Sequence, residues 1–130
     1  MAYVWVEKNG NMYRGYIEDK NGYVGRCGIS YWYNTWTISE WFVHRNHMNK
    51  GYGKAILRET AKAIYDEHGK PERIKYIWNG ANEYVYDWMV RNFDAKCTYP
   101  IWEQKITEED IWWAHEYELN PDKFIEYINK

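Results

Sequence analysis

The chain has 130 residues, of which 26 are aromatic, and it carries 17 basic and 19 acidic side chains for a net charge of −2. This length fits a single domain over residues 1–130, and the aromatic content excludes a disordered chain. The sequence offers no run of about 18 apolar residues for a membrane span and no secretory signal, so we expect a cytoplasmic protein, and the balanced charge argues against a nucleic-acid-binding protein.

The first predicted elements are four strands joined by hairpins. Asn9-Gly10 and Asn21-Gly22 are turn signals, because both residue types tolerate a positive φ. Between the turns, apolar and polar side chains alternate in the manner that is typical of strands. We therefore expect an antiparallel meander with strands at residues 3–7, 12–17, 23–33 and 36–44.

The second half of the chain changes to a helical period. Apolar side chains at helical spacing predict a helix over residues 53–68, which Gly69 and Pro71 would end. The alternation at 73–78 predicts a buried strand, and a second amphipathic helix follows at 82–92.

The C-terminal part is predicted to be extended first and helical afterwards. Residues 93–103 read as extended, Thr107 as the cap of a helix over 111–119, and Asn120 as the start of a last short helix. The whole order predicts a mixed α/β (α+β) fold, in which the meander is followed by β-α-β-α-β and C-terminal helices.

The segment that carries chemistry is the loop between the fourth strand and the first helix. The first N–H groups of a helix lack partners, and the helix dipole favours an anion beside them. Gly51 and Gly53 let the backbone approach a phosphate closely, and Arg45, Lys50 and Lys54 add positive charge. The loop therefore predicts an anion cradle that would fit a pyrophosphate. No metal site is predicted, since the two histidines before the loop lack a third ligand at suitable spacing.

The spacing in this loop resembles that of the GNAT N-acetyltransferases, whose acetyl-CoA-binding signature is R/Q-x-x-G-x-G/A. The signature aligns with residues 48–53, and Val43 matches a valine that the family often has eight residues before the first glycine. Met48 stands where Arg or Gln is usual, so Lys50 or Lys54 would have to compensate for a lost contact. The resemblance implies that acetyl-CoA contacts Phe42, Val43, Met48, Asn49, Lys50, Gly51, Tyr52, Gly53, Lys54 and Asn79.

A second, looser match lies downstream. The family often shows N-x-x-A-x-x-L-Y-E-K-L-G-F after its fifth strand; Asn79 aligns with the Asn, and Tyr86 falls seven residues later, as in the pattern. Asn82 replaces the Ala. The two motifs together cover about residues 36–95. In the family this tyrosine often protonates the thiolate leaving group, which is the role that the resemblance gives to Tyr86.

The resemblance implies that an amine attacks the thioester directly, with acetyl-CoA held between the fourth and fifth strands. Glu40 is the candidate base, because the alternation places it on one strand face with Ile38 and Phe42, where partial desolvation would make it a better proton acceptor. A bulge that turns Glu40 outward, a base acting through water and an amine that enters already neutral are the alternatives.

The acceptor is left open by the sequence. The family usually has one or two helices between its first two strands, where this chain has only a turn. Residues 97–130, with eight acidic and three basic side chains, are a candidate replacement wall that would suit a cationic acceptor. A protein lysine, a protein N-terminus and a small-molecule amine remain open, as does a homodimer. The alternative function is a non-catalytic binding or inhibitory module, and base stacking on residues 31–33 is a weaker third hypothesis.

Overall fold

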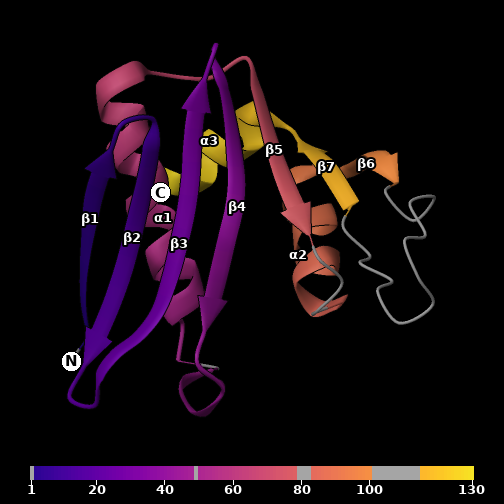
Figure 1. Cartoon of the computed structure of the whole chain (residues 1–130). Coiled ribbons are helices and arrows are strands. Elements are labelled where there is room, and N and C mark those ends of the chain that lie inside the picture. Colours follow the sequence, from indigo (N-terminus) through magenta and orange to yellow (C-terminus); the bar gives the residue numbers. More distant parts are fainter. Residues whose placement is uncertain (1, 49, 79–82, 101–114) are drawn as a thin grey trace, which may run out of the picture.

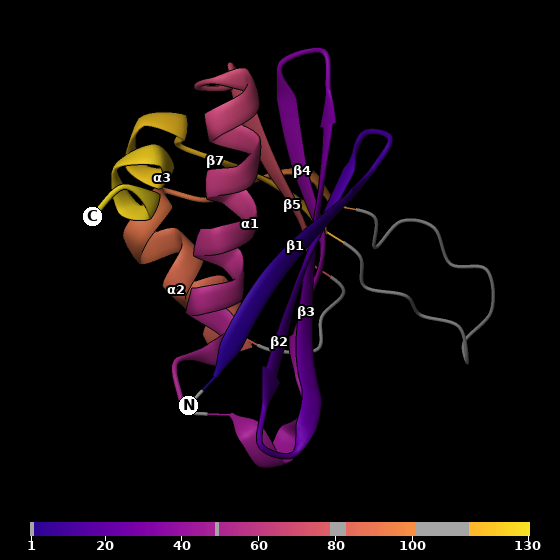
Figure 2. The same cartoon turned by 90° about the vertical axis from the view of Figure 1, so that its left-hand side faces the viewer.

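The computed structural model describes residues 2–48, 50–78, 83–100 and 115–130. The elements run in the order β1 (Tyr3–Asn9), β2 (Met12–Asp19), β3 (Gly22–Trp32), β4 (Thr35–Val43), a short 3-10 helix (Arg45–His47), α1 (Tyr52–His68), β5 (Arg73–Trp78), α2 (Glu83–Phe93), β6 (Lys96–Pro100), β7 (His115–Leu119) and α3 (Pro121–Ile128). Across these described ranges, seven strands form one sheet in the order β1-β2-β3-β4-β5-β7-β6 (Figure 1). Figure 2 shows that α1, α2 and α3 all lie on the same face of the sheet.

The predicted meander is confirmed, because β1 to β4 pair antiparallel with their neighbours in turn. Gly10 and Gly22 adopt the left-handed φ values of 62° and 92° in the first two turns, which glycine reaches without strain. The third turn uses Tyr33 and Asn34, whose φ values are 49° and 59°. Tyr33, which the sequence placed in a strand, therefore belongs to this turn.

The parallel pair β4 and β5 is joined by α1, which packs mainly against β2 and β3. A parallel connection needs a crossover of this kind, usually a helix. The helix buries Ile56, Leu57, Ala61 and Ile64 completely against the strands. The first predicted helix thus supplies one side of the hydrophobic core, while the strands supply the other.

The predicted helix over residues 111–119 is wrong in its described part, because residues 115–119 form β7. This strand pairs antiparallel with β5 and with β6. Tyr117 and Leu119 are buried, with 6% and 3% of their surface exposed, and the alternating Glu116 and Glu118 form ion pairs with basic side chains of β5. The two-residue period across a sheet therefore overrides the helical interpretation. The predicted cap Thr107 lies outside the described residues.

The last helix agrees with its prediction. The Asn120 side chain accepts a hydrogen bond of 3.0 Å from the backbone N–H of Lys123, and Pro121 occupies the first helical turn. Both are ordinary signals of a helix start. In the described residues α3 is the one helix that follows β7, and no described helix is both long and apolar enough to cross a membrane.

The strands β4 and β5 pair only over their first four residues. The parallel register runs from the pair Thr35 and Arg73 to the pair Ile38 and Tyr76 and then stops, although β4 continues to Val43. Figure 1 shows the two strands diverging toward their C-terminal ends. No described strand pairs with this edge of β4 beyond Ile38, so its backbone groups are available to a ligand.

Candidate functional site

The N-terminus of α1 follows the diverging strand β4 after the short 3-10 helix (Arg45–His47) and the glycine loop. Its N-cap residue is Gly51, which adopts a left-handed φ of 78°. The hydrogen bond nearest the start of the helix runs from the Ala55 N–H to the Gly51 carbonyl, at 3.1 Å. The backbone N–H groups of residues 52–54 therefore have no acceptor within the helix, which makes this end a site for an anion.

The two glycines of the loop are required for different reasons. Gly51 needs its left-handed backbone, which side chains rarely adopt. Gly53 is different, because an added Cβ would lie 3.7 Å from both Trp41 Nε1 and Val43 Cγ2, an ordinary contact distance. Packing within the protein thus does not demand glycine at 53. A bare backbone at this position instead fits a ligand that lies close against the first turn of the helix.

The loop is held in place by a buried carboxylate that the sequence analysis missed. Asp19 at the end of β2 accepts a hydrogen bond of 3.1 Å from the Tyr52 hydroxyl and lies 3.3 Å from Nδ1 of His47. Its side chain is only 5% exposed. The backbone N–H of Asn21 and then the Tyr52 hydroxyl lower the pKa of Asp19 below its usual value. In the sequence, the segment Asp-Lys-Asn-Gly that begins at Asp19 indicates only a turn. Its hydrogen-bond partner Tyr52 is 33 residues away, so no local pattern reveals it.

Basic and aromatic side chains surround this helix end. The Lys50 ammonium lies 5.7 Å from the ring centre of Tyr52, and the Lys54 ammonium lies 5.4 Å from that of Trp88 on α2. Met48 is half exposed beside them. The structure therefore brings together the predicted positions 48 and 50–54, while Asn49 and Asn79 lie outside the described residues.

The diverging half of β4 reaches the same helix end. The Trp41 indole N–H donates a hydrogen bond of 2.8 Å to the Gly53 carbonyl. Val43 lies on the face that α1 covers, whereas Phe42 points to the opposite face and is 39% exposed. The open edge of the strand and the bare turn of the helix are thus fixed to each other by the Trp41 side chain.

Glu40 lies on the face of the sheet that carries no helix, contrary to the face assumed from its sequence neighbours. Opposite β4, Gly28 pairs with Glu40 and Ile29 with Ile38, so that Ser39 is an extra residue in the strand. This bulge reverses the alternation. Ile38 is fully buried, while the Glu40 side chain is 28% exposed.

Two arginines hold the Glu40 carboxylate on that open face. Its Oε2 atom lies 3.4 Å from Nε of Arg14 and 3.1 Å from Nε of Arg26. Gly28 makes room for this position, because an added Cβ would come within 2.9 Å of the same oxygen. The carboxylate is therefore fixed beside the diverging half of β4, and its role as a base stays a prediction.

The second helix of the site approaches β4 through aromatic packing. The ring of Trp88 on α2 lies 5.7 Å from that of Trp41, and Trp88 and Met89 are buried in the core. Tyr86 belongs to the same helix, one turn or less before these contacts, and its side chain lies outside the described residues. The helix that carries the predicted acid thus packs next to the diverging strand.

Comparison with known proteins bears directly on this arrangement. The model of the family described as acetyltransferase (GNAT) family matches residues 2–86. The chain belongs to the GNAT acetyltransferase family. The matched region spans the meander, the glycine loop, α1 and the start of α2, so the GNAT resemblance inferred from the loop is confirmed over more of the chain than the two motifs covered.

Solved GNAT structures share the fold at low sequence identity. Nourseothricin acetyltransferase is similar with a TM-score of 0.69 and 16% identity over 86% of this chain and 66% of that one. The ribosomal-protein-S18-alanine N-acetyltransferase from Escherichia coli has a TM-score of 0.69 and 9% identity, covering 88% and 72%. A GNAT acetyltransferase from Elizabethkingia anophelis with acetyl-CoA bound has a TM-score of 0.64 and 12% identity, covering 92% and 97%. A comparison with curated proteins gives no match.

The GNAT family and the shared fold support acyl transfer as the general class of reaction and an N-acetyltransferase as the kind of protein. The chain spans about two thirds of the length of the nourseothricin enzyme. The acceptor and the mechanism of this chain are therefore proposed below.

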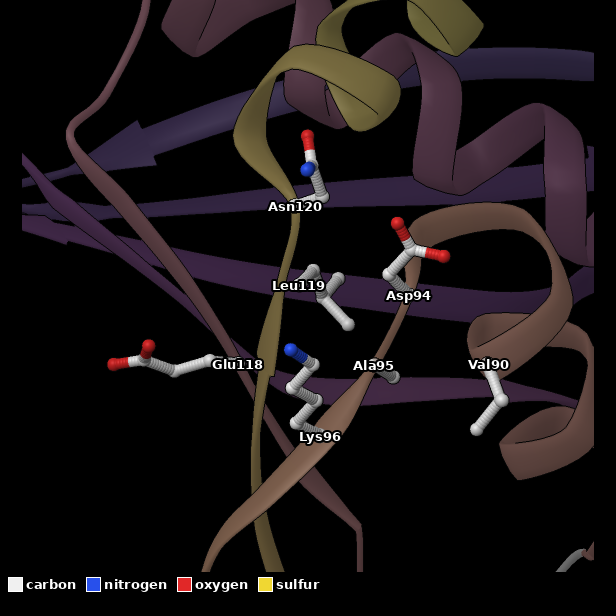
Figure 3. A pocket seen from close by; sticks show the side chains of 7 residues that line it. All are labelled: Val90, Asp94, Ala95, Lys96, Glu118, Leu119 and Asn120. Atoms are coloured by element: carbon white, nitrogen blue, oxygen red, sulfur yellow. The ribbon is translucent and has the colours of Figure 1, made fainter.

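A hollow of about 440 Å³ lies elsewhere on this GNAT chain (Figure 3). Its lining comes from the end of α2, from β6 and β7, and from the residue that caps α3: Val90, Asp94, Ala95, Lys96, Glu118, Leu119 and Asn120. None of these residues belongs to the loop or to β4. The hollow is thus separate from the helix end that the GNAT signature marks.

Proposed function

We propose that this chain transfers an acetyl group from acetyl-CoA to the nitrogen of an amine by direct attack on the thioester. The observation that carries the proposal is the coincidence of three features at one point: the bare first turn of α1, the left-handed Gly51 and the unpaired edge of β4. The indole of Trp41 joins the first and the third of these features, because it belongs to β4 and donates its hydrogen bond to the Gly53 carbonyl in the first turn of α1.

The loop residues would hold the pyrophosphate of acetyl-CoA. The N–H groups of residues 52–54 point out of the helix, where the dipole favours negative charge. Lys50 and Lys54 add two ammonium groups near this end and compensate for Met48. Gly53 leaves the backbone uncovered, which fits a bound phosphate group.

The open edge of β4 would align the pantetheine arm. Beyond Ile38 the backbone of this strand has no strand partner on the side of β5 within the described residues. Backbone N–H and C=O groups on such an open strand edge are free to pair with a ligand. The amide groups of an extended pantetheine can pair with the backbone at Phe42 and Val43 much as a further strand would.

Bound acetyl-CoA supplies the thioester carbon that the amine attacks. The nitrogen–carbon bond forms as the carbon–sulfur bond breaks, so the amine loses a proton and the sulfur leaves as a thiolate that takes one up. We assign the first proton to Glu40, directly or through a water molecule, and assign Tyr86 as the donor to the sulfur. Glu40 lies beside the open half of β4, and this position supports its assignment.

The names of two fold neighbours favour a nitrogen as the acceptor atom. They are a spermidine N-acetyltransferase from Vibrio cholerae in chimeric form and the ribosomal-protein-S18-alanine N-acetyltransferase from Escherichia coli. Both names state that the acetyl group goes to nitrogen, which is the acceptor atom that the proposed mechanism requires.

The test is the release of the free CoA thiol from acetyl-CoA in the presence of a panel of amines. The wild-type chain should release thiol only when an amine is present, and Tyr86→Phe should lower kcat about 100-fold, as expected for loss of a general acid. Tyr33→Phe, in the exposed β3–β4 turn, is the matched control and should leave kcat unchanged.

Two results would count against the proposal. Binding of acetyl-CoA without amine-dependent thiol release, for every amine in the panel, would support a non-catalytic binding module instead. Equal rates for Tyr86→Phe and the wild type would remove Tyr86 from the mechanism.

A further inference from the structure

A row of aromatic rings crosses the face of the sheet that no described helix covers. Successive ring centres lie 5.7, 5.3, 6.0, 5.7 and 5.7 Å apart. The aromatic row consists of Tyr3, Trp5, Tyr16, Tyr23, His44 and Phe42. Figure 2 shows the open face opposite the three helices.

The strand register explains why these rings share a face. Trp5 pairs with Tyr16, which pairs with Arg26, which pairs with Phe42 across four neighbouring strands. Val4 on β1, the sequence neighbour of Trp5, packs toward the core. Because successive side chains of a strand alternate, Trp5 and its cross-strand partners point away from the helices.

The aromatic row ends at the proposed reaction site. Phe42 and Glu40 both belong to the half of β4 that diverges from β5, and both lie on the open face. The helix that would bind the pyrophosphate lies on the other face. An acceptor that does not compete with the cofactor therefore reaches the thioester from the side of the aromatic row.

The charges on this face differ between the two ends of the row. Near β4, Arg14 and Arg26 flank Glu40. Near β1, Glu18 is exposed and forms no ion pair with any residue that the structure describes. Glu18 pairs in register with Tyr3 and Tyr23, so it lies between these two aromatic residues on the open face. Glu7 is also exposed, but it pairs in register with Arg14.

We propose that the aromatic row is the acceptor-binding surface and that it selects an elongated amine with more than one positive charge. The inference rests on the proposed function for its chemistry. Tyr and Trp faces attract cations, and the carboxylate of Glu18 adds to this attraction. The face lacks the excess of basic groups that phosphates would require, which disfavours a nucleic acid.

The Glu40 carboxylate at the β4 end suits the other end of the same molecule. An amine must be neutral to attack a thioester, and Glu40, which Arg14 and Arg26 hold in place, is the group proposed to accept its proton. Glu18 on β2 lies two strand spacings from β4, about 10 Å, and four residues along β2 from the register position of Glu40, about 13 Å, which together give about 16 Å. A linear polyamine is therefore long enough to keep one charged group among the rings near Glu18 while its terminal nitrogen lies near Glu40.

The test compares spermine with butylamine, a short monoamine, as acceptors for the full-length chain. Trp5→Ala should raise KM for spermine about tenfold, the loss expected for one cation–π contact in a partly desolvated site. The KM for butylamine and the affinity for acetyl-CoA should not change. Trp32→Ala is the matched control, because Trp32 is an exposed tryptophan on the same face near the far end of β3. It should leave all three quantities unchanged.

A calorimetric titration with spermine separates this inference from the proposed function. Spermine should bind the wild-type chain without acetyl-CoA, and both Trp5→Ala and Glu18→Gln should weaken that binding. Because calorimetry measures binding without turnover, it tests the inference even if the chain transfers no acetyl group. Absence of spermine binding, or equal effects of Trp5→Ala and Trp32→Ala, would overturn the inference. Binding of a single-stranded oligonucleotide or formation of a dimer, either one abolished by Trp5→Ala, would overturn it too.

Discussion

Gly53 is a residue at which the fold tolerates a side chain but the proposed ligand does not. Its added Cβ would make only ordinary contacts with Trp41 and Val43, and alanine favours helix over glycine by about 1 kcal/mol. We therefore predict that Gly53→Ala leaves the free energy of unfolding unchanged or raises it. The affinity for acetyl-CoA should fall about tenfold, because the added methyl group would displace the phosphate from its hydrogen bonds to the backbone. Urea unfolding and calorimetric titration measure the two quantities.

Gly69→Ala is the matched control for this prediction. Gly69 ends α1 with a φ of 76° and donates its N–H to the Tyr65 carbonyl at 2.8 Å. Alanine is strained there, so stability should fall by about 1 kcal/mol, and acetyl-CoA affinity should not change. A loss of affinity in Gly69→Ala equal to that in Gly53→Ala would show that the effect is not local.

The lowered pKa of Asp19 predicts how the stability of the fold depends on pH. Hydrogen bonds from Asn21 and Tyr52 lower its pKa in the folded chain. A lowered folded pKa contributes stability above the usual value near 4, and this contribution is lost as the pH falls through the folded pKa. Stability should therefore fall between about pH 6 and about pH 3, and less steeply in Asp19→Asn. Urea unfolding at both pH values measures the difference, and parallel losses in the two proteins would contradict the assignment.

At the scale of elements, the contact between α1 and β2 is set by one glycine. An added Cβ at Gly15 would overlap the hydroxyl oxygen of Thr60, which donates a hydrogen bond of 2.6 Å to the Ile56 carbonyl. Gly15→Ala should thus destabilise the fold by about 1–3 kcal/mol, as overpacking does.

A second substitution tests whether the overlap with Thr60 causes this loss of stability. Thr60→Ala removes the overlapping hydroxyl group, so adding it to Gly15→Ala should recover part of the lost stability, and a double-mutant cycle should show a coupling energy. Purely additive effects would mean that Gly15 is needed for a reason other than the approach of α1.

Elements with local signals were predictable from the sequence, and elements set by partners were not. The turns at Gly10 and Gly22 and the end of α1 at Gly69 follow from backbone preferences of single residues. Residues 115–119 were assigned to a helix, yet they form a strand because β5 and β6 lie on both sides of them. Tertiary pairing decides such short segments.

In the site, too, features with local sequence signals were predicted and features that depend on distant partners were not. The glycine loop and its helix were predicted, since both lie in one continuous segment. The face of Glu40 was predicted wrongly from the alternation, and the bulge at Ser39 was named only as an alternative, because it depends on the pairing of β3 with β4. Asp19 was missed because its partners Tyr52 and His47 come from distant parts of the chain.

The whole molecule places the two proposed substrates on opposite sides of one sheet. The helices and the pyrophosphate loop lie on one face, and the aromatic row lies on the other (Figure 2). The diverging ends of β4 and β5 connect the two sides. The chain has a turn between β1 and β2 in place of helices, and this turn leaves the second face open within the described residues.

The central claim is that the end of α1 binds acetyl-CoA, and thermal unfolding of the full chain tests it most directly. A ligand that binds only the folded state at 100 times its Kd adds about 2.7 kcal/mol to the stability. Saturating acetyl-CoA should therefore raise the Tm of the wild-type chain by several degrees and that of Gly53→Ala by much less at the same concentration. An unchanged Tm for the wild type, or an equal rise in both proteins, would contradict the account.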